Sequence, residues 1–258
     1  MSKEMTDEEL NTHCIEATEN LKNAMLEFAG SDDLHIKKRP MLLGYWLKSY
    51  TYFFKNEDSF QPSSVYKLKR GSVVQVEFGY RVGRELGGRH YAVVLDRDNK
   101  ISRNTVTVVP LGSIKENDEE EPWTVKLNDG LFSLVNNKLN VLLAEGHRTI
   151  DEADAMNESI ANATPEEAKK LRTIQRAKID QARQSCRQAK EWLAELSHMK
   201  LGSKVLVDQI TTVSKMRISQ PKKKSHPLFG IRLSDRDMDL IDEKLIELYF
   251  PQKFVNNS

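Results

Sequence analysis

The spacing of hydrophobic residues changes along the chain and divides it into segments of different predicted structure. In residues 1–62, apolar residues recur at roughly helical spacing, and Thr6 and Glu9 are placed as a capping box. Gly30 begins a break in this pattern, and Pro40 is suited to the first turn of a second helix. We therefore expect an N-terminal extension of two helices over residues 1–62.

From residue 66 to 129 the spacing becomes that of short strands. Apolar and polar residues alternate over 72–78, and β-branched residues are frequent in 91–95 and 105–109. Glycine and proline separate these runs, which is typical of a barrel or sandwich. The strand pattern resumes over 203–250, where Ser234 begins a last amphipathic helix.

Residues 130–202 interrupt the strand pattern with two long helical segments. Thr164, Pro165 and Glu167 supply an N-cap, a first-turn proline and a glutamate three residues after the cap. Because the turn at 162–163 is short, we expect an antiparallel helical hairpin. The hairpin is then an insertion into one β-fold that occupies 66–129 and 203–250.

Composition adds few limits to this picture. Lys and Arg total 39 against 38 acidic residues, so the net charge gives no reason to expect a polyanionic partner. The two cysteines, Cys14 and Cys186, form neither a disulfide framework nor a zinc site. The polar N-terminus and the absence of an apolar run of about 20 residues predict a cytoplasmic protein without a membrane segment.

Candidate chemistry gathers in the glycine-rich segment between the first two predicted strands. Arg81, Arg84, Arg89 and His90 lie in or beside it, and its glycines give a ligand close access to the backbone. This arrangement suits the binding of a phosphodiester, and a solvated hairpin loop fits the composition equally well. The six histidines are scattered and no metal-ligand motif occurs, so we expect no metal and no cofactor.

Four blocks in this order resemble the MazF/PemK (Kid) family of type II toxin endoribonucleases. They are KRGSVV, VGRELGGRHYAVVL, NTVTVVPLGS and VLVDQITTVSKMRI, and SDRDMDLIDEKLIELYF resembles the C-terminal helix of the family. The resemblance implies an α+β fold with a small SH3-like β-barrel of the MazF/PemK/CcdB type. It also implies metal-independent cleavage of single-stranded RNA by attack of the 2′-hydroxyl, a homodimer and a cognate antitoxin.

The resemblance assigns catalytic roles to four residues. Arg89 and His90 stand where many members have an arginine after the glycine-rich loop, and His90 can act as a general acid or base. Ser113 lies next to the position where members have Ser or Thr, and Asp208 matches the third block. RNA-binding residues implied in the same way are Arg81, Arg84, Gln209, Thr211, Lys215 and Arg217.

Two departures from the family pattern leave other functions open. Gly112 occupies the Ser or Thr position itself, and Thr211 stands where an arginine is frequent. Both favour a non-catalytic RNA-binding or regulatory module on the same barrel. A gyrase-directed toxin also shares the barrel, but it would not need the basic loop.

The helical additions carry no clear signal of function. They can enlarge a dimer interface, bind an antitoxin or shield the groove. The aromatic stripe of Trp46, Tyr50, Tyr52 and Phe54 has helical spacing, which is more typical of a core than of a base-stacking surface.

Overall fold

The computed structural model describes residues 5–114, 121–128, 130–197, 199 and 202–251. The chain forms two compact units: Met1–Phe60 with Glu77–Arg89, and Gln61–Val76 with His90–Ser258. Strands β1 and β2 pass from one unit into the other. The three-part division expected from the sequence stays a prediction.

Two helices make up most of the first unit, α1 (Asp7–Ala29) and α2 (Leu34–Asn56). The capping box at the start of α1 is confirmed, since Glu9 N donates to Thr6 Oγ1 at 3.2 Å and Thr6 N donates to Glu9 Oε2 at 2.8 Å. The predicted start of α2 at Pro40 is wrong. Asp33 caps the helix earlier by accepting a 2.7 Å hydrogen bond from His35 N, and Pro40 is buried inside α2.

The stripe of aromatic residues on α2 is not a core. Tyr50, Tyr52 and Phe54 are 51, 61 and 65% exposed, respectively. Trp46 is half-buried and packs with Tyr50 and Phe53 at ring-centroid distances of 5.6 and 6.1 Å. The spacing predicted a helix correctly, but it did not show which face the fold would cover.

Within the described residues, seven strands form one sheet of order β4-β5-β3-β2-β1-β7, in which β6 also pairs with β3. Short 3-10 turns lie at Pro62–Ser64 (η1), Val207–Gln209 (η2) and Lys215–Arg217 (η3). The strands are β1 (Val73–Gly79), β2 (Gly88–Val94), β3 (Thr105–Ser113), β4 (Thr124–Lys126), β5 (Ser203–Leu206), β6 (Thr211–Ser214) and β7 (Ile218–Gln220). Helices and an antiparallel sheet confirm the predicted α+β class. Among the described residues, the pairing does not close the sheet into a ring.

Strand β3 continues through Pro110 to Ser113, beyond the run of 105–109 that the sequence pattern indicated. On one edge of β3, residues 105–108 pair with β6 and residues 111–113 pair with β5. Leu95 N donates to Thr107 O, and β2 and β3 pair at Ala92 and Pro110. In an antiparallel pair of strands, the backbone N–H groups of successive residues point alternately toward and away from the partner strand. At position 110 the backbone nitrogen points away from β2, into the gap between β6 and β5. The proline therefore removes no ladder bond.

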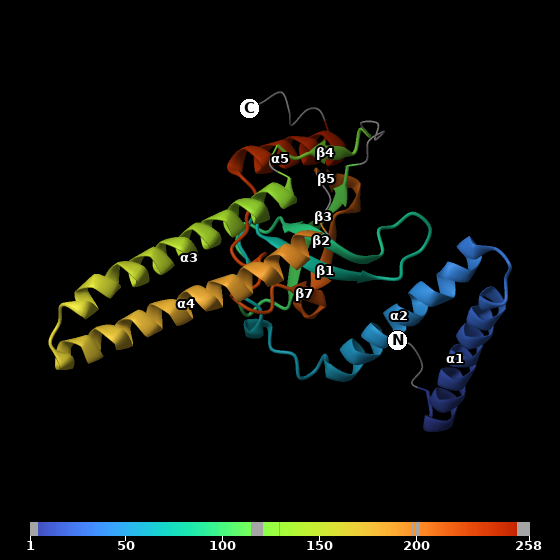
Figure 1. Ribbon diagram of the computed structural model, residues 1–258. Helices are drawn as coiled ribbons and strands as arrows, with labels where there is room; N and C mark the ends of the chain where they lie inside the picture. The colour runs from blue at the N-terminus through green and yellow to red at the C-terminus, as the bar shows by residue number, and fades with distance from the viewer. Residues whose placement is uncertain (1–4, 115–120, 129, 198, 200–201, 252–258) are drawn as a thin grey trace. The chain divides into compact units, whose positions relative to one another are not determined.

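The hairpin predicted for residues 130–202 is present as α3 (Leu131–Ala161) and α4 (Pro165–Ser197), two long helices side by side (Figure 1). The predicted start of α4 is confirmed, because the Thr164 hydroxyl and backbone N–H both bond the Glu167 carboxylate at 2.7 and 3.1 Å. Gly146 is buried in α3 and faces α4, because a Cβ at this position would lie 3.6 Å from Ser185 Cβ, an ordinary van der Waals distance.

Both faces of the sheet are buried. On one face, Val73, Val93 and Val205 pack in a core with residues of α3, of α4 and of α5 (Asp235–Tyr249). Neighbouring strand residues such as Val94 and Val108 are equally buried but lie outside that core, and successive side chains of a strand point to opposite faces. The sheet therefore separates two apolar layers.

Candidate functional site

The glycine-rich loop between β1 and β2 is shaped by backbone conformations that favour glycine. Gly79 and Gly88, at its two ends, have φ of +80° and +82°. Gly79 is also pressed against Trp46 of α2, since a Cβ at this position would lie 2.7 Å from the indole ring. The loop is thus tied to α2 within the first unit.

The arginines of this loop differ in how firmly they are held. Arg81 donates from Nε to Phe78 O at 3.2 Å and lies 3.8 Å from the Glu85 carboxylate. Arg89, at the start of β2, pairs across the hairpin with Glu77 at 3.4 Å and keeps 58% of its side chain exposed. Arg84 is exposed. Arg89 therefore has a fixed carboxylate partner and a guanidinium that solvent can reach.

His90 and Ser113 lie at the same end of the β2–β3 pair. The two antiparallel strands pair at Ala92 with Pro110, so His90 precedes that pair by two residues and Ser113 follows it by three. Ser113 is exposed and pairs in register with Ser203 of β5, and His90 is half-buried. The β2–β3 ladder thus brings the two residues to one edge of the second unit, with side chains that alternate to opposite faces of the sheet.

Tyr91, beside His90, contacts the inserted hairpin. Its hydroxyl donates to Glu195 Oε1 of α4 at 2.7 Å. Burial, reinforced by the Glu195 carboxylate, raises the pKa of the Tyr91 hydroxyl well above its usual value. Nothing in the local pattern of α4 points to this contact, which joins residues 104 positions apart.

The block around Asp208 lies in the turn between β5 and β6, both of which pair with β3. Asp208 is exposed and accepts a 3.1 Å hydrogen bond from Gln209 Nε2. Thr211 opens β6 opposite Val108, and Arg217 is half-buried in η3. This turn therefore exposes one carboxylate to solvent, that of Asp208.

Lys215 does not face a groove. It is 1% exposed, and its Nζ donates to the carbonyl oxygens of Lys100 and Ile101 at 2.9 and 3.4 Å. Burial lowers the pKa of its ammonium, and Asp96 acts in the opposite direction. Lys215 therefore fastens the loop between β2 and β3, a structural role in place of the RNA contact expected from the sequence.

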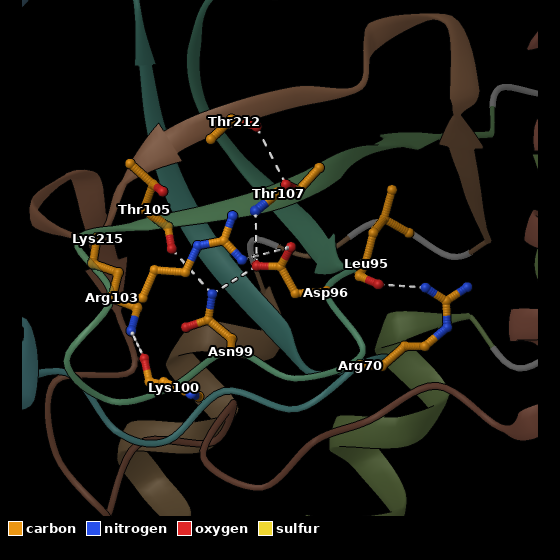
Figure 2. A network of polar contacts seen from close by, with 10 residues as sticks. All are labelled: Arg70, Leu95, Asp96, Asn99, Lys100, Arg103, Thr105, Thr107, Thr212 and Lys215. Carbon is orange, nitrogen blue, oxygen red and sulfur yellow. Dashed lines mark hydrogen bonds and ion pairs between the residues drawn. The ribbon is translucent and has the colours of Figure 1, made fainter.

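Figure 2 shows the rest of this loop network. Asn99 Nδ2 donates to Asp96 Oδ2 at 2.6 Å and to Thr105 O at 3.0 Å, and Thr107 N donates to the same Asp96 oxygen at 3.2 Å. Arg103 adds an ion pair with Asp96 at 3.9 Å. The loop is thus held in shape around one carboxylate.

A polar pocket of about 230 Å³, not anticipated from the sequence, lies beside the end of α4. Glu191 and Glu195 line it from the helix, and Lys223 and His226 line it from the segment after β7. Burial lowers the pKa of His226; Lys138 lowers it further, while Glu195 raises it. His226 Nδ1 accepts a 3.2 Å hydrogen bond from Leu228 N.

Metal-binding clusters and membrane-spanning helices are both absent from the described part of the chain. Within it, no group of three or more His, Cys, Asp or Glu side chains is placed to hold a metal ion. Within the same residues, no helix has the length and apolarity needed to cross a membrane.

Fold and site together define an α+β protein with a cationic, glycine-rich hairpin loop and with polar side chains at the end of the adjoining strand pair. Residues 69–189 match the family described as PemK-like, MazF-like toxin of type II toxin-antitoxin system. This match confirms the resemblance inferred from the sequence. The match includes the glycine-rich loop and β1–β4, whereas β5–β7 and α5 lie outside it. No curated protein matches the chain.

Proposed function

We propose that this protein is the toxin of a toxin-antitoxin system and a metal-independent endoribonuclease that cleaves single-stranded RNA. The observation that carries the proposal is the family match, which includes Arg81, Arg84, Arg89, His90 and Ser113. The exposed guanidinium of Arg89 supports it.

In the proposed reaction the substrate supplies its own nucleophile. The 2′-hydroxyl attacks the adjacent phosphorus, its proton passes to a base, and the bond to the 5′-oxygen breaks as that oxygen takes up a proton. The products are a 2′,3′-cyclic phosphate and a 5′-hydroxyl. This chemistry needs an acid-base group and a cation beside the phosphorane-like transition state.

The residues of the site divide these tasks. His90 is the acid-base group, because a neutral imidazole can accept a proton at one ring nitrogen and donate one from the other. Arg89 supplies the fixed charge for the phosphoryl oxygens. Ser113 contributes a hydroxyl and Asp208 a carboxylate at the edge of the site, and Arg81, Arg84, Gln209, Thr211 and Arg217 contact the RNA.

The finer points of architecture and biology belong to the same proposal. The two apolar layers on either side of the sheet support an SH3-like barrel, formed by residues 66–129 and 203–250 and interrupted by the hairpin of 130–202. We further propose a homodimer that acts in the cytoplasm and is neutralised by a cognate antitoxin.

The test is incubation of the purified protein with long single-stranded RNA in EDTA, alongside His90→Ala, Arg89→Ala and Ser113→Ala. A control variant, Ser219→Ala, removes a hydroxyl that bonds Gln75 in the sheet and plays no part in the proposed site. We expect cleavage by the wild type and the control and a loss of at least about a hundredfold in His90→Ala. Equal cleavage by all five proteins would contradict the assignment of the site.

A binding module without cleavage is the second candidate. Gly112 and Thr211 favour it, because they replace a hydroxyl and a cation of the family pattern with groups of different chemistry. RNA that is shifted on a gel but stays intact would identify this function. A protein that neither binds nor cuts RNA would indicate a protein target such as gyrase.

A further inference from the structure

The first unit contains a groove of about 1090 Å³, lined by α2 on one side and by the β1–β2 hairpin on the other. We propose that this groove holds single-stranded RNA and that α2 supplies its second wall. The inference rests on the proposed function and gives a role to the N-terminal helices.

The charge of the groove favours a polyanion. Its cationic side chains outnumber its carboxylates: Arg39, Lys48, Arg81 and Arg89 against Glu77 and Glu85. The two carboxylates already pair with the hairpin arginines. The excess positive charge of the groove therefore comes from Arg39 and Lys48 of α2. These side chains can bind the phosphates of RNA.

Arg39 and Lys48 are both exposed on α2. The Arg39 guanidinium lies 5.1 Å from the centre of the Phe28 ring, which fixes its direction by a cation–π contact. A cation that is held in place by a neighbouring ring loses little freedom when it binds a phosphate.

The groove also offers an aromatic platform. Tyr45 lines it and is 65% exposed, so its ring is accessible to a nucleobase. Beside it, Trp46 also lines the groove and is pressed against Gly79. Exposed aromatic rings among cations are the common device for binding single-stranded nucleic acid, because every base can stack on them.

The groove contains one residue of the proposed cleavage site. Arg89 lines the groove, and its guanidinium is the cation proposed for the phosphoryl oxygens. RNA that stacks on Tyr45 can therefore place a phosphate at this guanidinium.

The experiment measures binding without cleavage. A fluorescent RNA oligonucleotide with 2′-O-methyl groups throughout lacks the nucleophile, so its affinity is measured by anisotropy at several salt concentrations. Tyr45→Ala is compared with Tyr52→Ala, a tyrosine of α2 that is equally exposed, at 61%, and does not line the groove. Arg39→Gln with Lys48→Gln is compared with Lys37→Gln and Lys55→Gln, two exposed lysines of α2 outside the groove.

We expect Tyr45→Ala to weaken binding about tenfold, as for the loss of one stacked base. The Arg39 and Lys48 double variant is expected to lower the slope of log affinity against log salt by about 0.7 for each phosphate that the protein no longer neutralises. Both control variants should bind like the wild type. Groove variants that match their controls would overturn the inference, as would tight binding of a glutamate-rich peptide without binding of RNA.

Cleavage of unmodified RNA by the wild type in EDTA separates this inference from the proposed function. If the wild type cleaves but the groove variants bind like the controls, only the groove assignment fails. If the groove variants lose binding but the wild type never cleaves, the proposed nuclease activity fails and the groove stands.

Discussion

The hydroxyl of Tyr91 in β2 donates a 2.7 Å hydrogen bond to the carboxylate of Glu195, near the C-terminal end of α4. This bond ties the inserted hairpin to the strand residue that follows His90. The hairpin is therefore part of the framework around the proposed site. A contact of this kind links the stability of the hairpin to the geometry of the strand.

Tyr91→Phe tests the strength of that contact. We expect a loss of about 1–2 kcal/mol in the free energy of unfolding, because Glu195 loses its phenolic donor in a half-buried setting. Urea denaturation of wild type, Tyr91→Phe, Glu195→Gln and the double variant measures the coupling. Additive effects of the two substitutions would show that the bond contributes nothing.

The raised pKa of Tyr91 predicts a dependence of stability on alkaline pH. The folded protein holds the phenolic proton above the pH at which an unfolded tyrosine, with a pKa of about 10, releases it. The stability that this provides is complete below about pH 10 and is lost as the pH rises toward the folded pKa. Wild-type stability should fall more steeply than that of Tyr91→Phe between about pH 9.5 and 11, and parallel curves would contradict this.

The lowered pKa of His226 predicts a loss of stability in mild acid. Its folded pKa is lowered, mainly by burial, so below about pH 6.5 the unfolded chain binds a proton that the folded chain resists. Stability should therefore fall as the pH drops from about 7 to 5, and His226→Gln should reduce this fall. Denaturation midpoints at the two pH values measure it. A variant with the full wild-type dependence would show that other groups cause the loss.

Lys215→Met distinguishes a structural lysine from an RNA contact. We expect a loss of about 1–3 kcal/mol of stability, because the carbonyls of Lys100 and Ile101 lose their buried donor. The salt dependence of RNA affinity should not change. A stable variant with a shallower salt slope would return Lys215 to the RNA-binding surface.

Local sequence signals predicted helices and strands well where the determining contacts are themselves local. The caps at Thr6 and Thr164 bond residues three positions away, so the sequence contains both partners. Pro40 misled because a stronger cap, Asp33, begins α2 earlier. Pro110 misled because a strand can contain proline where no neighbouring strand needs its N–H. The gap between β6 and β5 provides such a place, and it depends on the whole sheet and not on the sequence of β3 alone.

The site was less accessible to prediction than the fold. The loop cations and His90 could be proposed because they are close in sequence and lie in a block that resembles a known family. The burial of Lys215 and the contact between Tyr91 and Glu195 depend on packing between distant segments. The groove of the first unit likewise requires α2 and the hairpin loop to come together.

The most direct test of the central claim is the chemistry of the RNA ends that the wild-type protein produces in EDTA. Fragments are isolated from a long single-stranded RNA and their termini are identified by mass spectrometry. Fragments with 2′,3′-cyclic phosphate and 5′-hydroxyl ends are the predicted result, because the 2′-hydroxyl is the nucleophile. Intact RNA, or cleavage that leaves 3′-hydroxyl and 5′-phosphate ends, would contradict the proposed mechanism.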